Sequence, residues 1–292
     1  MTYRTSPVAI GGLGGSGTRV FAESLRQAGL AIGQELNTPL DNLWFTILFK
    51  RAIWARHIPD PTDIAISVGL FRRAMTTGLQ GHLSPSEQAL LDRLRADLPP
   101  DGSWHCGAKI PHADSLIASG PQPGGQGKRW GWKEPNTHLF LPQLDHHMPG
   151  LRYIHIVRDG LDMAFSANTW QAKHWAHHYG LRQAPGTKPL PLDQLRYWVT
   201  ANARALNYGQ AQMPGRFLVM DYDEFCARPR NHWPRLQRFL GQPVDTPIPD
   251  GLISPSTIGR SLSQDLSIFP DTLLKEVQAL QSRIETLTQK TS

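Results

Sequence analysis

Short apolar runs and stretches of helical periodicity follow one another at the start of the chain. The run Val8–Ile10 leads directly into glycines, and from Thr18 to Gly29 apolar residues recur at spacings of three and four. This change of period predicts a strand, a glycine-rich loop and a helix that ends at Gly29. A second apolar run, Leu30–Ile32, predicts another strand.

The same alternation returns in the second half of the chain. Apolar runs predict strands at Trp130–Trp132, Leu151–Val157 and Phe217–Met220, and helical spacing predicts helices at Leu139–Leu144, Gly160–Thr169 and Trp233–Leu240. Strands that alternate with helices form parallel sheets covered on both faces. We therefore predict an α/β fold, a three-layer parallel sheet flanked by helices, in a single domain over residues 1–292.

Residues 39–129 have a different pattern. Apolar positions between Leu43 and Trp54 fit an amphipathic helix, and Ser84–Glu87 is typical of a helix N-terminus that leads into Ala89–Leu98. The glycine-rich residues 120–127 predict a loop. We expect a mostly helical insertion. Its aromatic residues fit the core of the inserted helices better than an exposed binding platform, and these are Trp44, Phe45, Phe49 and Trp54.

Composition and charge narrow the possible partners. The chain is 40% hydrophobic and 18% charged, as in ordinary globular proteins, and its net charge of +6 is spread along the sequence. A diffuse positive charge suits anionic ligands. Nucleic-acid binding requires a clustered basic face, which the sequence does not show, so we expect no nucleic-acid partner.

The cysteines and the N-terminus indicate a compartment. Cys106 and Cys226 have neither CxxC nor metal-ligand spacing, so no disulfide framework is predicted. The first residues lack the apolar core of a signal peptide, and no apolar run approaches the roughly 18 residues of a membrane span. We expect a reduced, cytoplasmic protein without a membrane span.

The segment Gly11–Arg19, GGLGGSGTR, has the features of an anion-binding loop. Glycines allow backbone N–H groups to turn toward an anion, and the N-terminus of the following helix adds a partial positive charge. Ser16 and Thr18 add hydroxyl donors. The position between a predicted strand and a predicted helix favours phosphate binding over a simple connecting turn.

The loop lacks the lysine of the nucleotide triphosphatases. Their GxxxxGK[ST] motif has Lys, which reaches the β- and γ-phosphates, where this chain has Thr18. Two alternatives stay open. A dinucleotide fingerprint fits the loop's glycines, with Glu35 as its acidic partner. A P-loop kinase or nucleotidase would need a magnesium-binding carboxylate, for which Asp221 is the candidate.

A second candidate site follows the predicted strand Leu151–Val157. Arg158 stands at the end of this strand, and Ser166 follows eight residues later, which places it about two turns into the next predicted helix. Ligands of open α/β sheets bind at the carboxyl ends of the strands, so Arg158 is expected at the same edge as the glycine loop. An Arg fork and a Ser hydroxyl can share one phosphate. The alternative is a surface network of Arg158 with Asp159 or Asp162.

Together these motifs resemble the sulfotransferase family that uses 3′-phosphoadenosine 5′-phosphosulfate (PAPS). The letters GGSGTR are similar to the family's 5′-phosphosulfate loop, and the strand–Arg–seven residues–Ser unit is similar to its 3′-phosphate motif. Phe217–Gly241 also resembles the family's segment of a strand, a tyrosine followed by an acid, a proline and a helix that ends in FLG. The layout is similar to that of bacterial and protein-tyrosine or heparan sulfotransferases. The resemblance implies a P-loop-type fold and transfer of a sulfuryl group from PAPS to a hydroxyl or amine, without a required metal.

The resemblance also implies which residues bind the cofactor. Those for the 5′-phosphosulfate are Gly14, Gly15, Ser16, Gly17, Thr18 and Arg19. Those for the 3′-phosphate are Arg158, Ser166 and, near the C-terminus, Arg260.

The catalytic residues are harder to transfer because Gly15 stands where the family often has a loop lysine. Arg19 and Lys133 are the candidates to replace it. Lys133, in GWKEPNTH, resembles the Lys-x-Pro element of the protein-tyrosine and heparan branches. A cation placed where charge develops on the leaving phosphate stabilises the transition state.

Attack by an acceptor hydroxyl requires a general base. Glu35, in LAIGQELN, resembles the base segment of protein-tyrosine sulfotransferases, and burial would raise the pKa of a carboxyl there. His138, Glu134 and His112 are the reserve candidates.

Two further questions concern metals and the acceptor. His174, His177 and His178 have helical spacing that metal ligands can use, but no partner carboxylate or Cys is close in sequence, so no metal site is expected. The acceptor, whether a small molecule, peptide or saccharide, would be bound partly by the insertion 39–129. A nucleotide-binding module without catalysis is the alternative to an enzyme, and the oligomeric state stays open.

Overall fold

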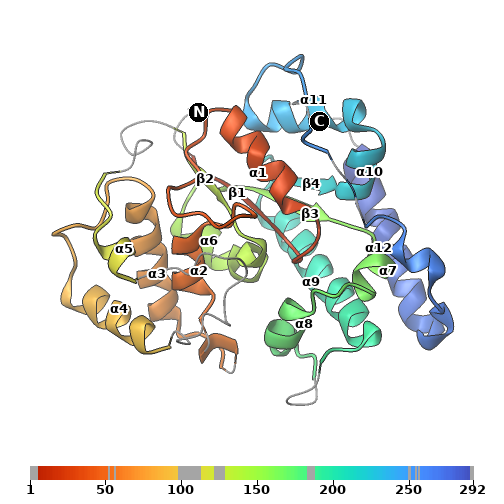
Figure 1. Ribbon diagram of the computed structural model, residues 1–292, viewed down its shortest axis with the longest axis horizontal. Helices are drawn as coiled ribbons and strands as arrows, with labels where there is room; N and C mark the ends of the chain where they lie inside the picture. The colour runs from red at the N-terminus through yellow and green to blue at the C-terminus, as the bar shows by residue number, and fades with distance from the viewer. Residues whose placement is uncertain are drawn as a thin grey trace.

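The computed structural model describes residues 6–51, 53–55, 57–97, 113–121, 129–182, 188–248, 251–253, 255 and 257–289. Within these residues, four parallel strands form one sheet in the order β2-β1-β3-β4 (Figure 1). The strands are β1 (Val8–Gly12), β2 (Gly131–Lys133), β3 (Arg152–Val157) and β4 (Phe217–Asp221). Ile10 lies in register with both Lys133 and Ile154, so the carboxyl ends of the strands reach one edge of the sheet. The predicted α/β fold is confirmed.

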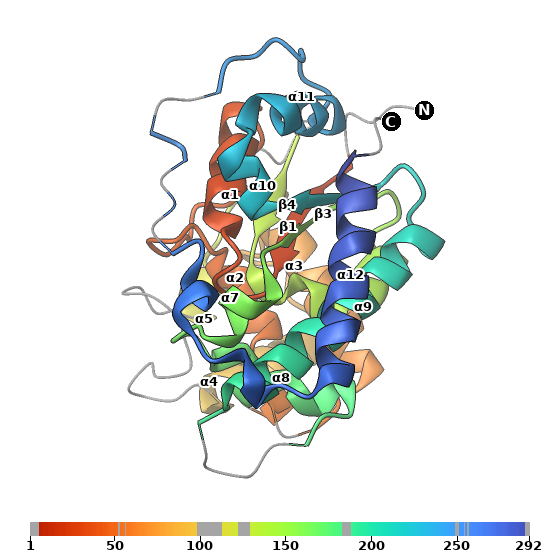
Figure 2. The ribbon, with the colours of Figure 1, turned by 90° about the vertical axis from the view of Figure 1, so that its right-hand side faces the viewer.

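The strands bury side chains on both faces of the sheet, in two separate clusters. Ile10, Ile154 and Met220 pack on one face against α1 (Thr18–Gln27), α10 (Tyr222–Ala227) and α11 (Pro229–Leu240). Ala9, Tyr153 and Val219 belong to the larger cluster on the opposite face, with α9 (Pro191–Gln212) and α12 (Asp271–Gln289). Figure 2 shows these two helical layers with the sheet between them. The three-layer arrangement follows from the period-two alternation of apolar side chains along each strand.

Short helices make most of the remaining connections. They are η2 (Pro135–Phe140), α6 (Leu141–His147), α7 (Gly160–Ala164), α8 (Trp170–Trp175), η3 (Ala176–Tyr179), η4 (Arg260–Ser263) and η5 (Leu266–Ile268).

The insertion is helical where the structure describes it. Its elements are α2 (Leu43–Phe49), η1 (Ile53–Ala55), α3 (Pro61–Ala74), α4 (Pro85–Asp97) and α5 (Ala113–Ile117). The predicted N-terminus of α4 is confirmed: Glu87 N–H donates to Ser84 Oγ at 3.3 Å and Ser84 N–H donates to Glu87 Oε2 at 2.9 Å. Most of the predicted loop at residues 120–127 lies outside the described residues.

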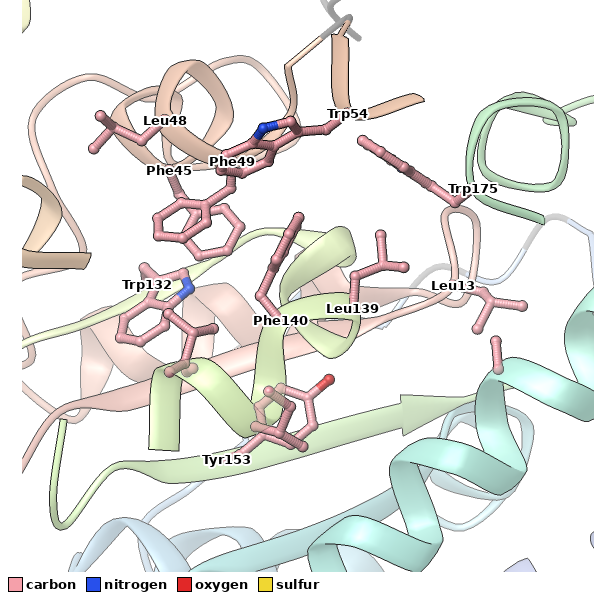
Figure 3. Close-up of a cluster of buried hydrophobic side chains, with 14 of the residues drawn as sticks. Leu13, Phe45, Leu48, Phe49, Trp54, Trp132, Leu139, Phe140, Tyr153 and Trp175 are labelled. Carbon is pink, nitrogen blue, oxygen red and sulfur yellow. The ribbon is translucent and has the colours of Figure 1, made fainter. Parts of the chain in front are cut away.

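The aromatic side chains of the insertion are buried, as predicted. Phe45 stacks on Phe49 at 4.4 Å between ring centroids, and it also stacks on Trp132 of β2 at 5.9 Å. Figure 3 shows these rings together with Trp54 and Phe140 in one cluster. The insertion therefore shares its core with the sheet.

Three local predictions are wrong. The residues Leu30–Ile32 form a single bridge, between Ala31 and Trp130, instead of a strand. The helix predicted over Leu43–Trp54 ends at Phe49, and all seven of its residues are buried, so it has no polar face. The helix at Gly160 ends at Ala164, which leaves Ser166 beyond its C-terminus.

Candidate functional site

A cavity of about 340 Å³ opens at the carboxyl ends of the strands. Its walls come from the segments that follow β1, β2 and β3, from the start of α10, and from residues before and after α2. The start of α8 and Thr257 complete them. The lining residues are Gly14, Gly15, Gly17, Thr18, Arg19, Pro39, Asp41, Lys50, Lys133, Glu134, Pro135, Asn136, Arg158, Asn168, Trp170, Gln171, Tyr222 and Thr257. A larger cavity of about 810 Å³ lies between α3 and α6, is mostly apolar, and contains none of the predicted site residues.

The glycine loop has the backbone conformation that its sequence predicts. Gly15 and Gly17 have φ values of +97° and +85°, which favour glycine. A Cβ atom at Gly17 would lie 2.1 Å from Cδ2 of Tyr222, so the ring and the loop fit only with glycine. The hydroxyl of Ser16 is buried and has no hydrogen-bond partner among the described residues. The first N–H groups of α1 have no carbonyl partner within the helix. They border the cavity at Thr18 and Arg19.

Arg158 reaches this loop from the end of β3. Its Nη1 donates to the carbonyl of Gly15 at 3.3 Å, and its Nη2 donates to the carbonyl of Thr257. Its guanidinium also lies 3.7 Å from the Asp162 carboxylate and 3.6 Å from that of Asp223. Arg158 therefore lies at the same sheet edge as the glycine loop, as expected. It also pairs with Asp162, but this pair is buried and is not the surface network given as the alternative.

The other two residues expected to bind the 3′-phosphate lie near partners of Arg158. A Cβ at Gly15 would be 3.9 Å from Ser166 Oγ, so this hydroxyl faces the glycine loop although it lies outside α7. Arg260 donates from Nη1 to the carbonyl of Asp162 at 3.1 Å. Asp162 holds the same segment by its carboxylate, which accepts from Gly259 N–H at 2.7 Å and from Ser261 N–H and Oγ, both at 2.8 Å.

Lys133 is buried and is not an exposed surface lysine at the end of a strand. Its Nζ donates to the carbonyl of Pro39 at 2.8 Å and forms an ion pair with Asp41. Asp41 Oδ2 accepts from Asn37 Nδ2 at 2.9 Å. Arg19, the other candidate cation, is exposed and lines the same cavity. The structure thus brings both predicted cations to one cavity.

Two of the predicted general bases, Glu35 and His138, do not line the cavity. Glu35 is partly exposed and is not among the residues that line the cavity. His138 is buried, with Nδ1 2.9 Å from the carbonyl of Pro135, and it does not line the cavity either. Burial, reinforced by the neighbouring His155, lowers the pKa of His138 to about 3, so its ring is neutral at pH 7. His112 lies outside the described residues.

Glu134 is the reserve candidate that does line the cavity. Its carboxylate is buried and caps the start of η2, where Oε2 accepts from Asn136 N–H at 2.7 Å and Oε1 accepts from Asn136 Nδ2 at 2.8 Å. Burial raises the pKa of Glu134 to about 7, against the opposing effect of Lys50. In the sequence, the signal for Glu134 as a site residue was its position directly after Lys133.

Other lining residues were not predicted from the sequence. Lys50 lies over the ring of Trp170, with Nζ 4.0 Å from the centroid, and Gln171 Oε1 accepts from Gly14 N–H at 3.0 Å. These residues come from the end of α2 and from α8, so no local motif connects them to the glycine loop.

The described part of the chain offers neither a metal site nor a membrane-spanning helix. Among the described residues, no group of three or more His, Cys, Asp or Glu side chains is arranged to hold a metal ion. Of the helices in the described part of the chain, none combines the length and apolarity needed to cross a membrane.

Comparison with known proteins gives one family. The chain matches the sulfotransferase family over residues 7–246. No curated protein matches it. Among solved structures, the sulfotransferase domain of the Synechococcus PCC 7002 olefin synthase is 15% identical, with a TM-score of 0.46 and coverage of 99% of this chain and 97% of that chain. For the sulfotransferase of Alicyclobacillus acidocaldarius the identity is 15%, the TM-score 0.45 and the coverage 98% and 97%. For a sulfotransferase of Mycobacterium tuberculosis H37Rv the values are 15%, 0.42, and 97% and 77%. Because the family match spans most of its length, the chain belongs to the sulfotransferase family.

Proposed function

We propose that the protein is a PAPS-dependent sulfotransferase that moves a sulfuryl group to a hydroxyl or amine of a small-molecule, peptide or saccharide acceptor. The contact of Arg158 with Gly15 supports this most directly, because it joins two anion-binding elements at one cavity. PAPS carries phosphates at both its 5′ and 3′ positions, and a nucleotide with both would engage the glycine loop and Arg158 together.

The proposed binding roles follow the two elements. The 5′-phosphosulfate is bound by Gly14, Gly15, Ser16, Gly17, Thr18 and Arg19. The Ser16 hydroxyl, which has no hydrogen-bond partner among the described residues, is one donor. Arg158, Ser166 and Arg260 bind the 3′-phosphate.

The proposed reaction is a direct in-line displacement. The acceptor oxygen or nitrogen forms a bond to sulfur while the bond from sulfur to the 5′-phosphate oxygen breaks, and adenosine 3′,5′-bisphosphate leaves. Lys133 and Arg19 stabilise the charge that develops on this leaving group. The acceptor's proton goes to a carboxylate, for which Glu35 and Glu134 are the candidates and His138 is a neutral, buried reserve.

Ligand binding tests the proposal. Isothermal titration calorimetry should show binding of adenosine 3′,5′-bisphosphate and at least about tenfold weaker binding of ATP. Arg158→Gln should weaken the bisphosphate by about 10- to 100-fold, because it removes a charge-assisted contact, whereas the exposed control Arg26→Gln should not. Tighter binding of ATP would overturn the proposal.

Catalysis needs a separate test. Release of the bisphosphate from PAPS should be screened across small alcohols, phenols, amines, peptides and saccharides, with and without EDTA. We expect activity to persist in EDTA. Lys133→Met should lower kcat about 100-fold with bisphosphate affinity retained; an unchanged rate would favour a different catalytic cation, and bisphosphate binding without turnover of any acceptor would favour the inactive nucleotide-binding module.

A P-loop kinase or nucleotidase is less well supported. Asp221 at the end of β4 uses Oδ1 to accept from Asp223 N–H at 2.9 Å and Glu224 N–H at 3.1 Å, as the N-cap of α10, and it does not line the cavity. Magnesium-dependent turnover of ATP would reverse this preference. The insertion is proposed to bind the acceptor, and the cytoplasmic location predicted from sequence stays a prediction.

A further inference from the structure

A chain of hydrogen bonds crosses the cavity wall from the glycine loop to Glu134. Gly14 N–H donates to Gln171 Oε1 at 3.0 Å, and Gln171 Nε2 donates to Asn136 Oδ1 at 2.8 Å. Asn136 in turn donates to both carboxylate oxygens of Glu134, from Nδ2 at 2.8 Å and from its backbone N–H at 2.7 Å. Elements that are far apart in the sequence are thus connected through two side-chain amides.

The direction of this chain is determined by a tryptophan. Trp175 Nε1 can only donate, and it lies 2.9 Å from Asn136 Oδ1. The Asn136 oxygen therefore accepts, its Nδ2 faces Glu134, and Gln171 must present Nε2 to Asn136 and Oε1 to Gly14. Glu134 receives only donors from this chain, so the arrangement suits an ionised carboxylate with lone pairs still available to a proton.

Charged and titratable groups from several elements lie near Glu134. Lys133 precedes it but is paired with Asp41, Lys50 approaches from the end of α2, and the Tyr153 phenol lies on the side of the sheet. Burial raises the pKa of Glu134 and Asp41 raises it further, while Lys50 and the Asn136 donors lower it, with a result of about 7. A base with a pKa near the working pH is the most effective proton acceptor.

We propose that Glu134 is the general base of the transfer reaction, and that Asn136 and Gln171 are positioning residues that hold it at a fixed place relative to the phosphosulfate loop. This inference rests on the proposed function. The acceptor hydroxyl loses its proton to the Glu134 carboxylate as its oxygen bonds to sulfur, and the electron pair of the broken S–O bond leaves with adenosine 3′,5′-bisphosphate.

A purely structural role as the cap of η2 is the competing explanation. Glu134→Gln keeps the length and one acceptor oxygen but cannot take up a proton, and Glu276→Gln, at an exposed position of α12, is the matched control. PAPS turnover is measured with the most active acceptor of the panel, or with water if no acceptor responds. We expect Glu134→Gln to lower kcat at least about 100-fold, with the Kd for adenosine 3′,5′-bisphosphate nearly unchanged. The melting temperature should fall by only a few degrees, because the Gln amide nitrogen meets one of the two Asn136 donors. Glu276→Gln should stay within about threefold of the wild type.

The pH profile separates a base from a cap. The wild-type kcat should rise with pH through about 7, since the base acts only when ionised. Lys50→Met removes the cation that lowers the pKa of Glu134, so the rising limb of the profile should shift to higher pH by about one unit. A structural cap would leave this limb in place.

The positioning residues have their own test. Gln171→Leu removes the link between Gly14 and Asn136, so Glu134 loses its fixed place relative to the loop and kcat should fall about tenfold. The pH limb and the Kd for adenosine 3′,5′-bisphosphate should stay nearly unchanged. The proposal is overturned if Glu134→Gln keeps more than a fifth of the wild-type kcat, or if it loses nucleotide binding and melting temperature together. Failure of the wild-type protein to bind adenosine 3′,5′-bisphosphate would instead overturn the proposed function itself.

Discussion

Lys133 and Asp41 form a buried ion pair beside the glycine loop, with side chains only 2% and 9% exposed. A buried pair of this kind is costly to break from one side, because the remaining charge stays buried without a partner. The pairing also gives Lys133 a fixed position, since Asp41 is itself held by Asn37.

The ion pair predicts that the double variant loses less stability than the two single variants together. Asp41→Asn and Lys133→Met should each lower the free energy of unfolding by about 3 kcal/mol, whereas the double variant should lose clearly less than the sum. Urea denaturation at pH 7 measures all three. Strictly additive losses would show that the two side chains do not interact in solution.

Gly17 faces the Tyr222 ring, and this close approach predicts a large effect of one methyl group. Gly17→Ala should destabilise the protein by about 2–4 kcal/mol and weaken binding of adenosine 3′,5′-bisphosphate, because either the loop or the ring must move. Gly29→Ala is the control: its φ is also positive, at +74°, but its Cβ would meet no atom within 4 Å. It should cost only about 1 kcal/mol. Equal effects would mean that backbone conformation alone is responsible.

Asp162 connects the segment 259–261 to the helix that follows Arg158. Asp162→Asn places an amide nitrogen against donors that now meet a carboxylate, so it should release this segment and weaken the bisphosphate about tenfold. Ser261→Ala removes one of these bonds and should have a smaller effect. Calorimetry measures affinity, and hydrogen exchange should rise in residues 257–263. Unchanged affinity in Asp162→Asn would show that the segment does not contribute to nucleotide binding.

His155 predicts a loss of stability in acid. It is buried in β3, with Nδ1 3.1 Å from the Tyr153 hydroxyl and Nε2 2.9 Å from Asn202 Oδ1, and burial lowers its pKa to about 4. Between pH 6.5 and 4 the unfolded chain binds a proton that the folded protein does not, so stability falls as the pH falls. The contribution approaches about 3 kcal/mol at pH 4.

A comparison of variants tests this assignment. His155→Gln should flatten the dependence of unfolding free energy on pH between 6.5 and 4, while the exposed control His82→Gln should keep the wild-type slope. An unchanged slope in His155→Gln would assign the acid sensitivity to other histidines, among which His138 is also buried.

The elements that depend mainly on residues close together in the sequence were predictable. Local periodicity and the conformational freedom of glycine predicted four of the five expected strands, the glycine loop and the helix from Thr18. Helix ends were less predictable. Nothing in the apolar spacing after Leu43 indicates that the helix stops at Phe49, since α2 is buried on every side.

Contacts between distant segments could not be predicted from spacing. The pairing of Lys133 with Asp41 and the link from Gln171 to Asn136 each join parts of the chain that no motif relates. The base assignment depended on such contacts, because only the folded chain shows that Glu134 lines the cavity while Glu35 does not. The resemblance identified residue types, and tertiary packing decided which of them meet.

The stacking of Phe45 on Trp132 limits how this protein can change its specificity. Trp132 is the immediate neighbour of Lys133, and Phe71 of α3 meets the same indole edge-on at 5.0 Å. A graft that replaced residues 39–129 with those of a relative would remove these rings and disturb the lysine beside them. Under the proposed function, acceptor preference can therefore diverge by substitutions at the cavity wall, but exchange of the whole insertion as a cassette would require Trp132 and its contacts to change with it.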